Sequence, residues 1–309
     1  MREWLHISTA DYHALPAFGS GAIRCFSMDG PLEFWARYIS RTKVKDETDP
    51  MRLGRAFHAA METGDWQSGY WPIPTVIQDD AYASEINAAM EGRKSQGARL
   101  NPGDEINTRL PAHRLYLAAH ETQAQTRGLD FLTEAEIESV KRQVQACYDH
   151  AGIADLLQHK SSLNVEATCV LQHSSGLKLK ALCDLVLTNG ILDFKTTGQR
   201  NNFSFLRDAF RKGYDFQAGQ YSVVTGKEQF WFASVTSEPP FEANLFEVPP
   251  SLLLQRAEDV NRQTEVIAQT MRMSALDDKD SQGIPASWHS EGWNTALEFS
   301  LDGPWGDAA

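Results

Sequence analysis

The chain has 309 residues, of which 42% are hydrophobic and 23% charged, a composition that excludes disordered and collagen-like proteins. It contains no run approaching the roughly 18 apolar residues of a membrane span, and its first residues lack the apolar core of a signal peptide, so we expect a cytoplasmic protein. The formal net charge of −12 argues at first against a nucleic-acid partner, because binding to nucleic acid depends on neutralising phosphates.

The acidity is unevenly distributed along the chain. Residues 255–309 hold ten acidic and four basic side chains, which is half of the excess, whereas residues 195–213 hold five basic side chains and one acidic. Association follows the local potential rather than the sum. The sequence therefore predicts a basic track on a negative body, with binding to nucleic acid that weakens as salt rises.

The four cysteines, Cys25, Cys147, Cys169 and Cys183, show no C-x-x-C spacing. This pattern fits neither a zinc finger nor a secreted disulfide framework. We expect reduced and mostly buried thiols.

The first half of the chain is predicted to be helical and rich in loops. Apolar residues at helical spacing predict a helix over 51–63, and residues 64–130 read as a mixed, loop-rich insert because prolines interrupt the pattern. Thr133 and Glu136 form a capping box that predicts the start of a further helix.

From residue 163 the apolar pattern changes to that of extended strands joined by tight turns. The predicted order is three strands, a helix, two strands and a helix, at 163–171, 177–188, 191–196, 203–224, 229–235, 242–248 and 250–273. We expect the tail to be irregular or held by docking. The chain is thus divided into an N-terminal helical part, a core and an acidic tail containing tryptophan, at residues 1–130, 131–273 and 274–309.

Asp193-Phe194-Lys195 on the third predicted strand is the sharpest local feature. Side chains alternate along a strand, so Asp193 and Lys195 share one face while Phe194 points into the packed layer. A second Asp-x-Lys, at 277–279, lies in the tail without a strand around it. Only the strand copy therefore has a context that suits chemistry.

Two further carboxylates are predicted to lie near this strand. Asp184 precedes Asp193 across the tight Asn189-Gly190 turn, and Glu166 lies on the strand before. Carboxylates this close are costly unless a cation lies between them, and hard oxygen ligands suit Mg²⁺. A bound divalent ion and a lysine beside a water together favour hydrolysis of a phosphodiester.

These residues resemble the core of PD-(D/E)XK nucleases. The segment Leu53-Gly54-Arg55-Ala56-Phe57-His58 is similar to the helix motif of the RecB-like branch, in which the histidine contributes to the metal site. Gln217-Ala218-Gly219-Gln220-Tyr221 is similar to the Q-x-x-x-Y motif of that branch. The resemblance implies a mixed α/β fold with a restriction-endonuclease-like core, a central mixed sheet flanked by helices, and helical N-terminal additions.

Within that branch the chain resembles the RecE-type exodeoxyribonucleases (exodeoxyribonuclease VIII) of phages and prophages. The resemblance rests on residues 7–13, on 20–34 and on the segment 190–197, and it covers roughly residues 5–250. It implies an enzyme of the bacterial cytoplasm that degrades linear duplex DNA from 5′ ends and leaves 3′ single-stranded tails for recombination. It also implies a homo-oligomeric ring, a tetramer by this likeness, and a single-strand annealing protein as partner.

The resemblance assigns a role to each motif residue. His58, Asp184, Asp193 and Glu166 are expected metal ligands for Mg²⁺, for which Mn²⁺ substitutes, with the Phe194 carbonyl as an extra ligand. Lys195 is expected to orient the attacking water, and Gln217 and Tyr221 to lie near the scissile strand. The expected catalytic residues are thus Lys195, Asp193, Asp184, Glu166, Gln217 and Tyr221.

Contacts to DNA are expected from basic side chains near these motifs and from threonines that follow the catalytic lysine. They are Arg52, Arg55, Lys178, Lys180, Thr196, Thr197, Arg200, Arg207, Arg211 and Lys212.

Other functions remain open at this point. An endonuclease of the same fold has the same motifs. A scaffold that binds DNA without cleaving it would lack the metal carboxylates or the lysine, and here all of them are present. A hydrolase of a small phosphorylated molecule would not need the basic run at 200–212. An iron–sulfur nuclease of the RecB-like branch is disfavoured, because no cysteine follows Cys183.

Overall fold

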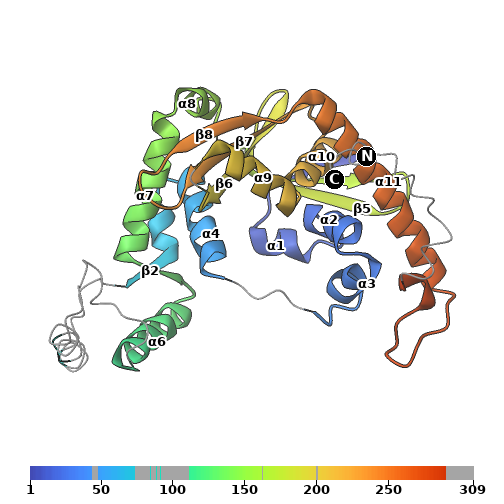
Figure 1. Cartoon of the computed structure of the whole chain (residues 1–309), viewed down its shortest axis with the longest axis horizontal. Helices are drawn as coiled ribbons and strands as arrows, with labels where there is room; N and C mark the ends of the chain where they lie inside the picture. Colours follow the sequence, from blue (N-terminus) through green and yellow to red (C-terminus); the bar gives the residue numbers. More distant parts are fainter. Residues whose placement is uncertain are drawn as a thin grey trace.

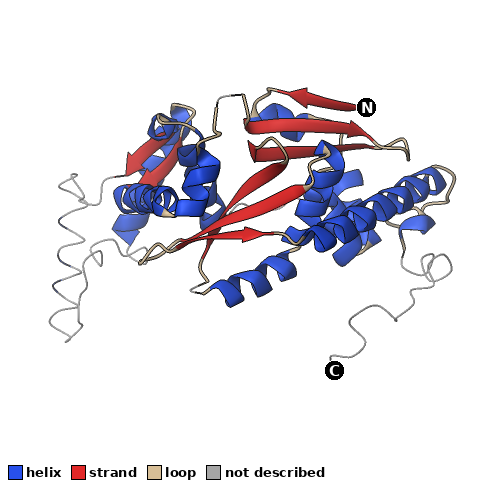
Figure 2. Cartoon of the chain, turned by 90° about the horizontal axis from the view of Figure 1, so that it is seen from above, coloured by secondary structure: helices blue, strands red, loops and turns tan. Residues whose placement is uncertain are grey.

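The computed structural model describes residues 1–43, 48–73, 111–161, 163–199 and 201–289, with positions 84, 88 and 91. A twisted sheet crosses the middle of the molecule and helices cover both of its faces (Figures 1 and 2). Within the described residues its strand order is β1-β4-β5-β6-β7-β8, and only β6 and β7 pair in parallel. The strands are β1 (Arg2–Leu5), β4 (Val165–Gln172), β5 (Lys178–Val186), β6 (Gly190–Thr197), β7 (Gln229–Thr236) and β8 (Ala243–Glu247).

The helices fall into an N-terminal group, a group beside β3 (Asp130–Thr133) and a C-terminal group. They are α1 (Thr9–Ala14), α2 (Ser20–Met28), α3 (Pro31–Phe34), α4 (Asp49–Glu62), α6 (Pro111–Thr126), α7 (Glu134–Asp149), α8 (Ala151–Leu157), α9 (Asn202–Lys212), α10 (Tyr214–Thr225) and α11 (Pro250–Ser274). A π-helical turn covers Trp35–Ile39, and short 3-10 turns cover Trp66–Gly69 and Ala286–Trp288. None of the helices in the described ranges is both long and apolar enough to cross a membrane.

Each face of the sheet has its own hydrophobic core, because successive strand residues point to opposite sides. Ile191 belongs to the core shared with α2, α10 and α11, whereas Leu192 and Phe194 belong to the core shared with α4, α7 and α8. Asp193 and Lys195 consequently face the α10 side, as the alternation predicts. β6 is thus held from both sides.

The core elements expected from periodicity are present. The strands of residues 163–248 and the helix beginning at Pro250 match their predicted ranges within about two residues, and the mixed α/β fold with a mixed sheet between helices is confirmed. The Thr133 side chain accepts from the Glu136 N–H at 3.2 Å, and the Glu136 carboxylate accepts from the Thr133 N–H at 2.7 Å. The predicted capping box is therefore confirmed.

Three features differ from the predictions. The helix expected over 203–224 is two helices, because Gly213 adopts a left-handed φ of 71° that ends α9 and starts α10. Part of the region read as a loop-rich insert forms β2 (Tyr70–Ile73), which pairs in parallel with β3 (Asp130–Thr133). The N-terminal segment adds β1 to the edge of the main sheet beside β4. All three depend on contacts or dihedrals that periodicity does not encode.

The acidic tail is described as far as His289. Its Trp288 is fully buried and stacks on Phe34 of α3 with ring centroids 5.7 Å apart. Trp293 and Trp305 lie outside the described residues. The first part of the tail is therefore held by docking on the N-terminal helices.

Candidate active site

The two central aspartates meet at one position of the sheet. Leu185 of β5 pairs with Leu192 of β6, and Asp184 and Asp193 are the next residues of the two strands beyond that pair. The backbone N–H of Phe194 donates to Asp184 Oδ2 at 2.7 Å. Asp193 is 1% exposed and Asp184 9%. The sheet register thus brings two buried carboxylates together, as the sequence spacing predicts.

Asp193 is held by side chains of the core. The Lys195 ammonium forms an ion pair with Asp193 Oδ2 and lies 4.9 Å from the centroid of the Tyr214 ring. Gln217 of α10 donates from Nε2 to Asp193 Oδ1 at 2.6 Å. Both oxygens of Asp193 therefore have partners within the protein. We call Asp193, Lys195 and Gln217 the lysine cluster.

Asp184 belongs to a second group of side chains, which α4 completes. His58 Nδ1 lies 3.3 Å from Asp184 Oδ2. Glu62 follows His58 by one helical turn, so both side chains point from α4 toward the sheet. One ligand atom from each of His58, Glu62 and Asp184 lies within 4.8 Å of the others. We call these three residues the histidine cluster.

The histidine cluster contains a carboxyl group that is hard to ionise. Burial, together with the nearby charges of Glu166 and Asp184, raises the pKa of Glu62 to about 10. Burial also acts against charge on Asp184, but His58, Lys195 and the Phe194 N–H outweigh it and lower the pKa of Asp184. A proton or a metal cation therefore has to compensate the carboxylates at this position.

The lysine cluster is compensated by its own cation. Burial acts against the ammonium charge of Lys195, but Asp193 and Asp184 outweigh it and raise the pKa of Lys195. Burial raises the pKa of Asp193 to about 6, although Lys195 acts in the opposite direction. Lys195 consequently stays protonated near neutral pH and serves as a hydrogen-bond donor rather than as a base.

Glu62 was missed in the sequence. The signal was present, because His58 and Glu62 are four residues apart on one helix. A glutamate at the end of a helix is common, however, and only the packing of α4 on β6 turns this one toward Asp184. Glu62 also interacts with Glu166, which has a positive φ of 43° in β4 and an exposed side chain. Glu166 therefore interacts with the histidine cluster through its contact with Glu62.

Tyr221 lies deeper than the other motif residues. It is 6% exposed and its ring packs against Phe230 at a centroid distance of 6.0 Å. Gln217 and Tyr221 share a face of α10, as their spacing predicts, but Gln217 reaches Asp193 while Tyr221 fills the core.

Two of the expected DNA contacts are engaged inside the fold. Arg52 is 8% exposed and donates to the Phe131 carbonyl and to Glu136 Oε1, both at 2.8 Å. Lys180 is 7% exposed and its ammonium donates to the Tyr12 carbonyl at 2.7 Å. Arg52 thus ties α4 to β3 and α7, and Lys180 ties β5 to α1.

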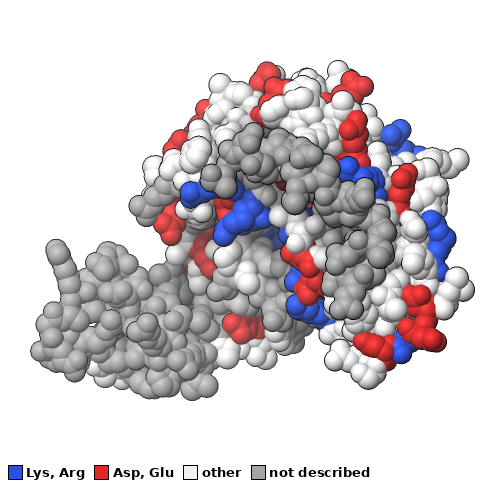
Figure 3. All heavy atoms as spheres, turned by 45° about the vertical axis from the view of Figure 1, so that its right-hand side comes forward, with Lys and Arg blue, Asp and Glu red and all other residues white. Residues whose placement is uncertain are grey.

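The other candidates lie nearer the surface, except Arg200, which lies outside the described residues. Arg55 pairs with Asp130 at 2.6 Å, Lys178 is exposed, and Arg207, Arg211 and Lys212 lie on exposed positions of α9. Thr196 is half-buried at the end of β6, and Thr197 accepts from the Gln199 N–H at 3.0 Å. On the face that Figure 3 draws, basic and acidic side chains are interspersed in the described region.

The donor set fits a divalent cation. An imidazole and two carboxylates converge in the histidine cluster, and Glu62 ionises there only with difficulty unless positive charge is supplied. Carboxylate oxygens are the preferred ligands of Mg²⁺ and Mn²⁺, and imidazole is compatible with the latter. His58, Asp184 and Glu62 would hold the ion, and Asp193 lies beside them.

A comparison with protein families identifies the family to which the chain belongs. The family model of the PD-(D/E)XK nuclease superfamily matches residues 26–290. The chain belongs to the PD-(D/E)XK nuclease superfamily. It is a metal-dependent nuclease.

Comparison with solved structures gives matches to exonucleases, of which one reaches a TM-score of 0.50. A provisionally assigned exonuclease from Eubacterium rectale matches with a TM-score of 0.50 and 11% identity over 86% of each chain. The alkaline exonuclease of Laribacter hongkongensis, in complex with dAMP, matches with a TM-score of 0.26 and 15% identity over 72% of this chain and 98% of the other. Among curated proteins, none matches the sequence significantly.

Proposed function

We propose that this nuclease is a Mg²⁺-dependent exodeoxyribonuclease that degrades linear duplex DNA from 5′ ends and leaves 3′ single-stranded tails. The arrangement of Lys195 next to two buried aspartates, one of which faces a set of metal ligands, carries the hydrolytic part of this proposal. The direction of degradation and the preference for ends rest on the RecE-like segments 7–13, 20–34 and 190–197.

The residues of the two clusters have complementary tasks in hydrolysis. A divalent ion held by His58, Asp184 and Glu62 would supply positive charge that polarises a phosphate oxygen and favours ionisation of a water. Lys195, held in place by Asp193, donates a hydrogen bond to the attacking water and stabilises charge that develops on the phosphate. Gln217 fixes the second oxygen of Asp193, so the carboxylate keeps one orientation during turnover.

The proposed oligomeric state, cellular location and partner protein rest on the same resemblance. The enzyme would act as a homo-oligomeric ring, a tetramer by this likeness, in the cytoplasm of a bacterium that carries a phage or prophage. A single-strand annealing protein would receive the 3′ tails for recombination. The exposed cations Arg55, Lys178 and Lys212 are the proposed contacts to DNA.

The test is nucleotide release from a linear duplex labelled separately on each strand and at each end. We expect Mg²⁺-dependent release that starts at 5′ ends and stops in Asp193→Ala. A covalently closed duplex of the same sequence serves as the control and should remain intact. Cleavage of the closed duplex would support the endonuclease alternative, and degradation from 3′ ends would refute the proposed direction.

A further inference from the structure

The surface of α9 carries an exposed apolar stripe. Phe203 is 76% exposed, Leu206 38% and Phe210 47%, and their spacing of three and four residues places them on one side of the helix. The opposite side of α9 buries Phe205 and Ala209 in the core. An apolar stripe of this kind on a helix that is already packed marks a site of interaction.

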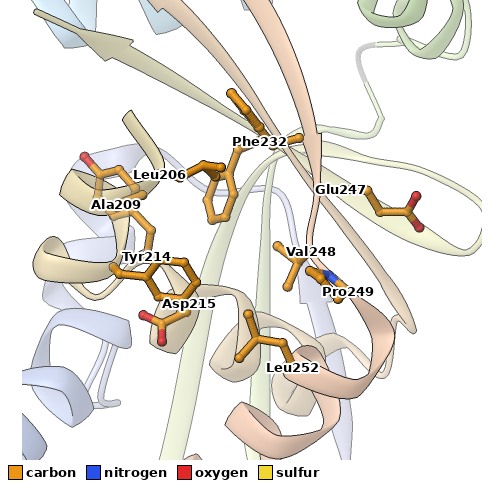
Figure 4. A pocket seen from close by; sticks show the side chains of 11 residues that line it. Leu206, Ala209, Tyr214, Asp215, Phe232, Glu247, Val248, Pro249 and Leu252 are labelled. Atoms are coloured by element: carbon orange, nitrogen blue, oxygen red, sulfur yellow. The ribbon is translucent and has the colours of Figure 1, made fainter. Parts of the chain in front are cut away.

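A small cavity continues the stripe into the molecule. It has a volume of about 60 Å³ and lies between α9, the start of α10, β7 and the first turn of α11 (Figure 4). Its apolar walls include Leu206, Phe210, Tyr214, Phe232, Val248 and Leu252. A cavity this small is too narrow for a nucleotide and suits the end of one apolar side chain.

Cations border the stripe. Arg207 is exposed, and Arg211, four residues further, has a side chain that is 79% exposed. Lys212 and Arg211 both pair with Asp208, each at 2.7 Å, which leaves α9 with a net positive charge. The surface therefore fits an occupant that is apolar and acidic.

The end of this chain has that composition. Residues 290–309 contain no lysine or arginine, four acidic residues and five large apolar ones. They are Glu291, Glu298, Asp302 and Asp307, with Trp293, Leu297, Phe299, Leu301 and Trp305. The segment follows Trp288, whose 3-10 turn packs on α11.

Residues 290–309 are long enough to span the distance between the two ends of α11. Leu252 lines the cavity from the first turn of α11, and a helix of this length spans about 37 Å. Twenty residues extend to at most about 66 Å. The segment can therefore reach the cavity without any change in the described fold.

Other occupants fit the surface less well. An α9 helix of a second copy would bring Arg207 and Arg211 of both copies together, which like charges oppose. Duplex DNA would pair its phosphates with the arginines but would leave Phe203 and Leu206 without an apolar partner. Only an acidic segment with large apolar side chains satisfies both parts of the surface.

We propose that residues 290–309 dock on α9 of the same chain, with an apolar side chain in the cavity and the acidic residues against Arg207 and Arg211. This contact is independent of the proposed direction of DNA degradation. It gives the acidic tail a defined place beside the catalytic strand, since Tyr214 lines the cavity and also contacts Lys195.

The test is photo-crosslinking in the full chain. We replace Phe210 by p-benzoylphenylalanine, irradiate, and map the linked peptides by mass spectrometry. We expect links from position 210 to residues 290–309, and a yield at least about threefold lower when the four acidic residues of the segment become amides, because the attraction to cations is lost. A crosslinker at Tyr148, an exposed aromatic on α7, is the control and should not reach the segment.

Mixing unlabelled and ¹⁵N-labelled chains separates the possible outcomes. Links confined to chains of one label support docking within the chain. Links between labels would assign the surface to a second copy, and links only to added DNA would assign it to the substrate. Either result, or the absence of links to residues 290–309, would overturn the proposal.

Discussion

The two clusters of the candidate active site both contain buried carboxyl groups, and the charges of these groups are compensated in different ways. In the lysine cluster the protein supplies its own cation, Lys195, to a buried aspartate. In the histidine cluster two carboxyl groups and an imidazole converge, and the pKa of Glu62 rises to about 10. The first cluster is complete within the chain, whereas the carboxyl groups of the second need a proton or a metal cation to compensate their charges. The comparison implies that catalysis and metal binding can be damaged separately.

The strongest test of this separation is Lys195→Met, which removes the internal cation and keeps an unbranched side chain that is one atom shorter. We expect the turnover rate at saturating Mg²⁺ to fall by about 10³ to 10⁴-fold, because the water and the developing phosphate charge lose their donor. Stabilisation of the fold by Mg²⁺, measured as the shift in Tm, should persist. Lys141→Met, at an exposed position of α7, is the matched control and should keep full activity.

Glu62→Gln tests the histidine cluster. The substitution removes one ligand charge but keeps its size, so we expect the Mg²⁺ concentration for half-maximal activity to rise about tenfold, in line with the loss of an interaction of about 1.4 kcal/mol. The rate at saturating Mg²⁺ should change much less. Titration of activity with Mg²⁺ measures both effects. An unchanged metal requirement would remove Glu62 from the metal site, and Glu258→Gln on the exposed side of α11 controls for surface charge.

Glu62→Gln should also change how the stability of the metal-free protein depends on pH, with a chelator present. The pKa of Glu62 is higher in the folded state than in the unfolded chain, so the folded state binds more protons between the two values. The contribution of Glu62 to stability therefore declines as pH rises from the ordinary carboxyl range toward about 10. We expect the metal-free wild type to lose stability between pH 6 and pH 9 more steeply than Glu62→Gln, as followed by urea denaturation. Equal slopes would contradict the burial of this carboxyl group.

The difference between the clusters also explains what the sequence could reveal. Asp184, Asp193 and Lys195 lie on neighbouring strands joined by a short turn at residues 187–189, so local spacing fixes their register. Glu62 depends on how α4 packs on β6, more than 120 residues along the chain, and no local pattern encodes that contact. The β2 and β3 pair was missed for the same reason, since its four-residue strands are far apart in sequence.

The helix that periodicity predicted as one element illustrates a second limit. The apolar pattern runs through residues 203–224 without interruption, and Gly213 alone marks the break. A side chain at Gly213 would meet Arg24 at 2.5 Å as well as an unfavourable φ. The break aims α10, and with it Gln217, at Asp193. The separate directions of α9 and α10 thus depend on Gly213 and its close approach to Arg24, and the Q-x-x-x-Y motif contains neither residue.

The smallest expected effects distinguish the two members of the Q-x-x-x-Y motif. Gln217→Leu removes the amide that donates to Asp193 Oδ1, and we expect a loss of about tenfold in turnover rate, because the aspartate that holds Lys195 loses one of its two partners. Tyr221→Phe removes only a hydroxyl from a ring that packs on Phe230 in the core, so the rate should stay within about twofold of wild type. Rate measurements at saturating Mg²⁺ on the same linear duplex compare the two directly. A larger loss in Tyr221→Phe than in Gln217→Leu would mean that the tyrosine hydroxyl, rather than the glutamine amide, connects α10 to the lysine cluster.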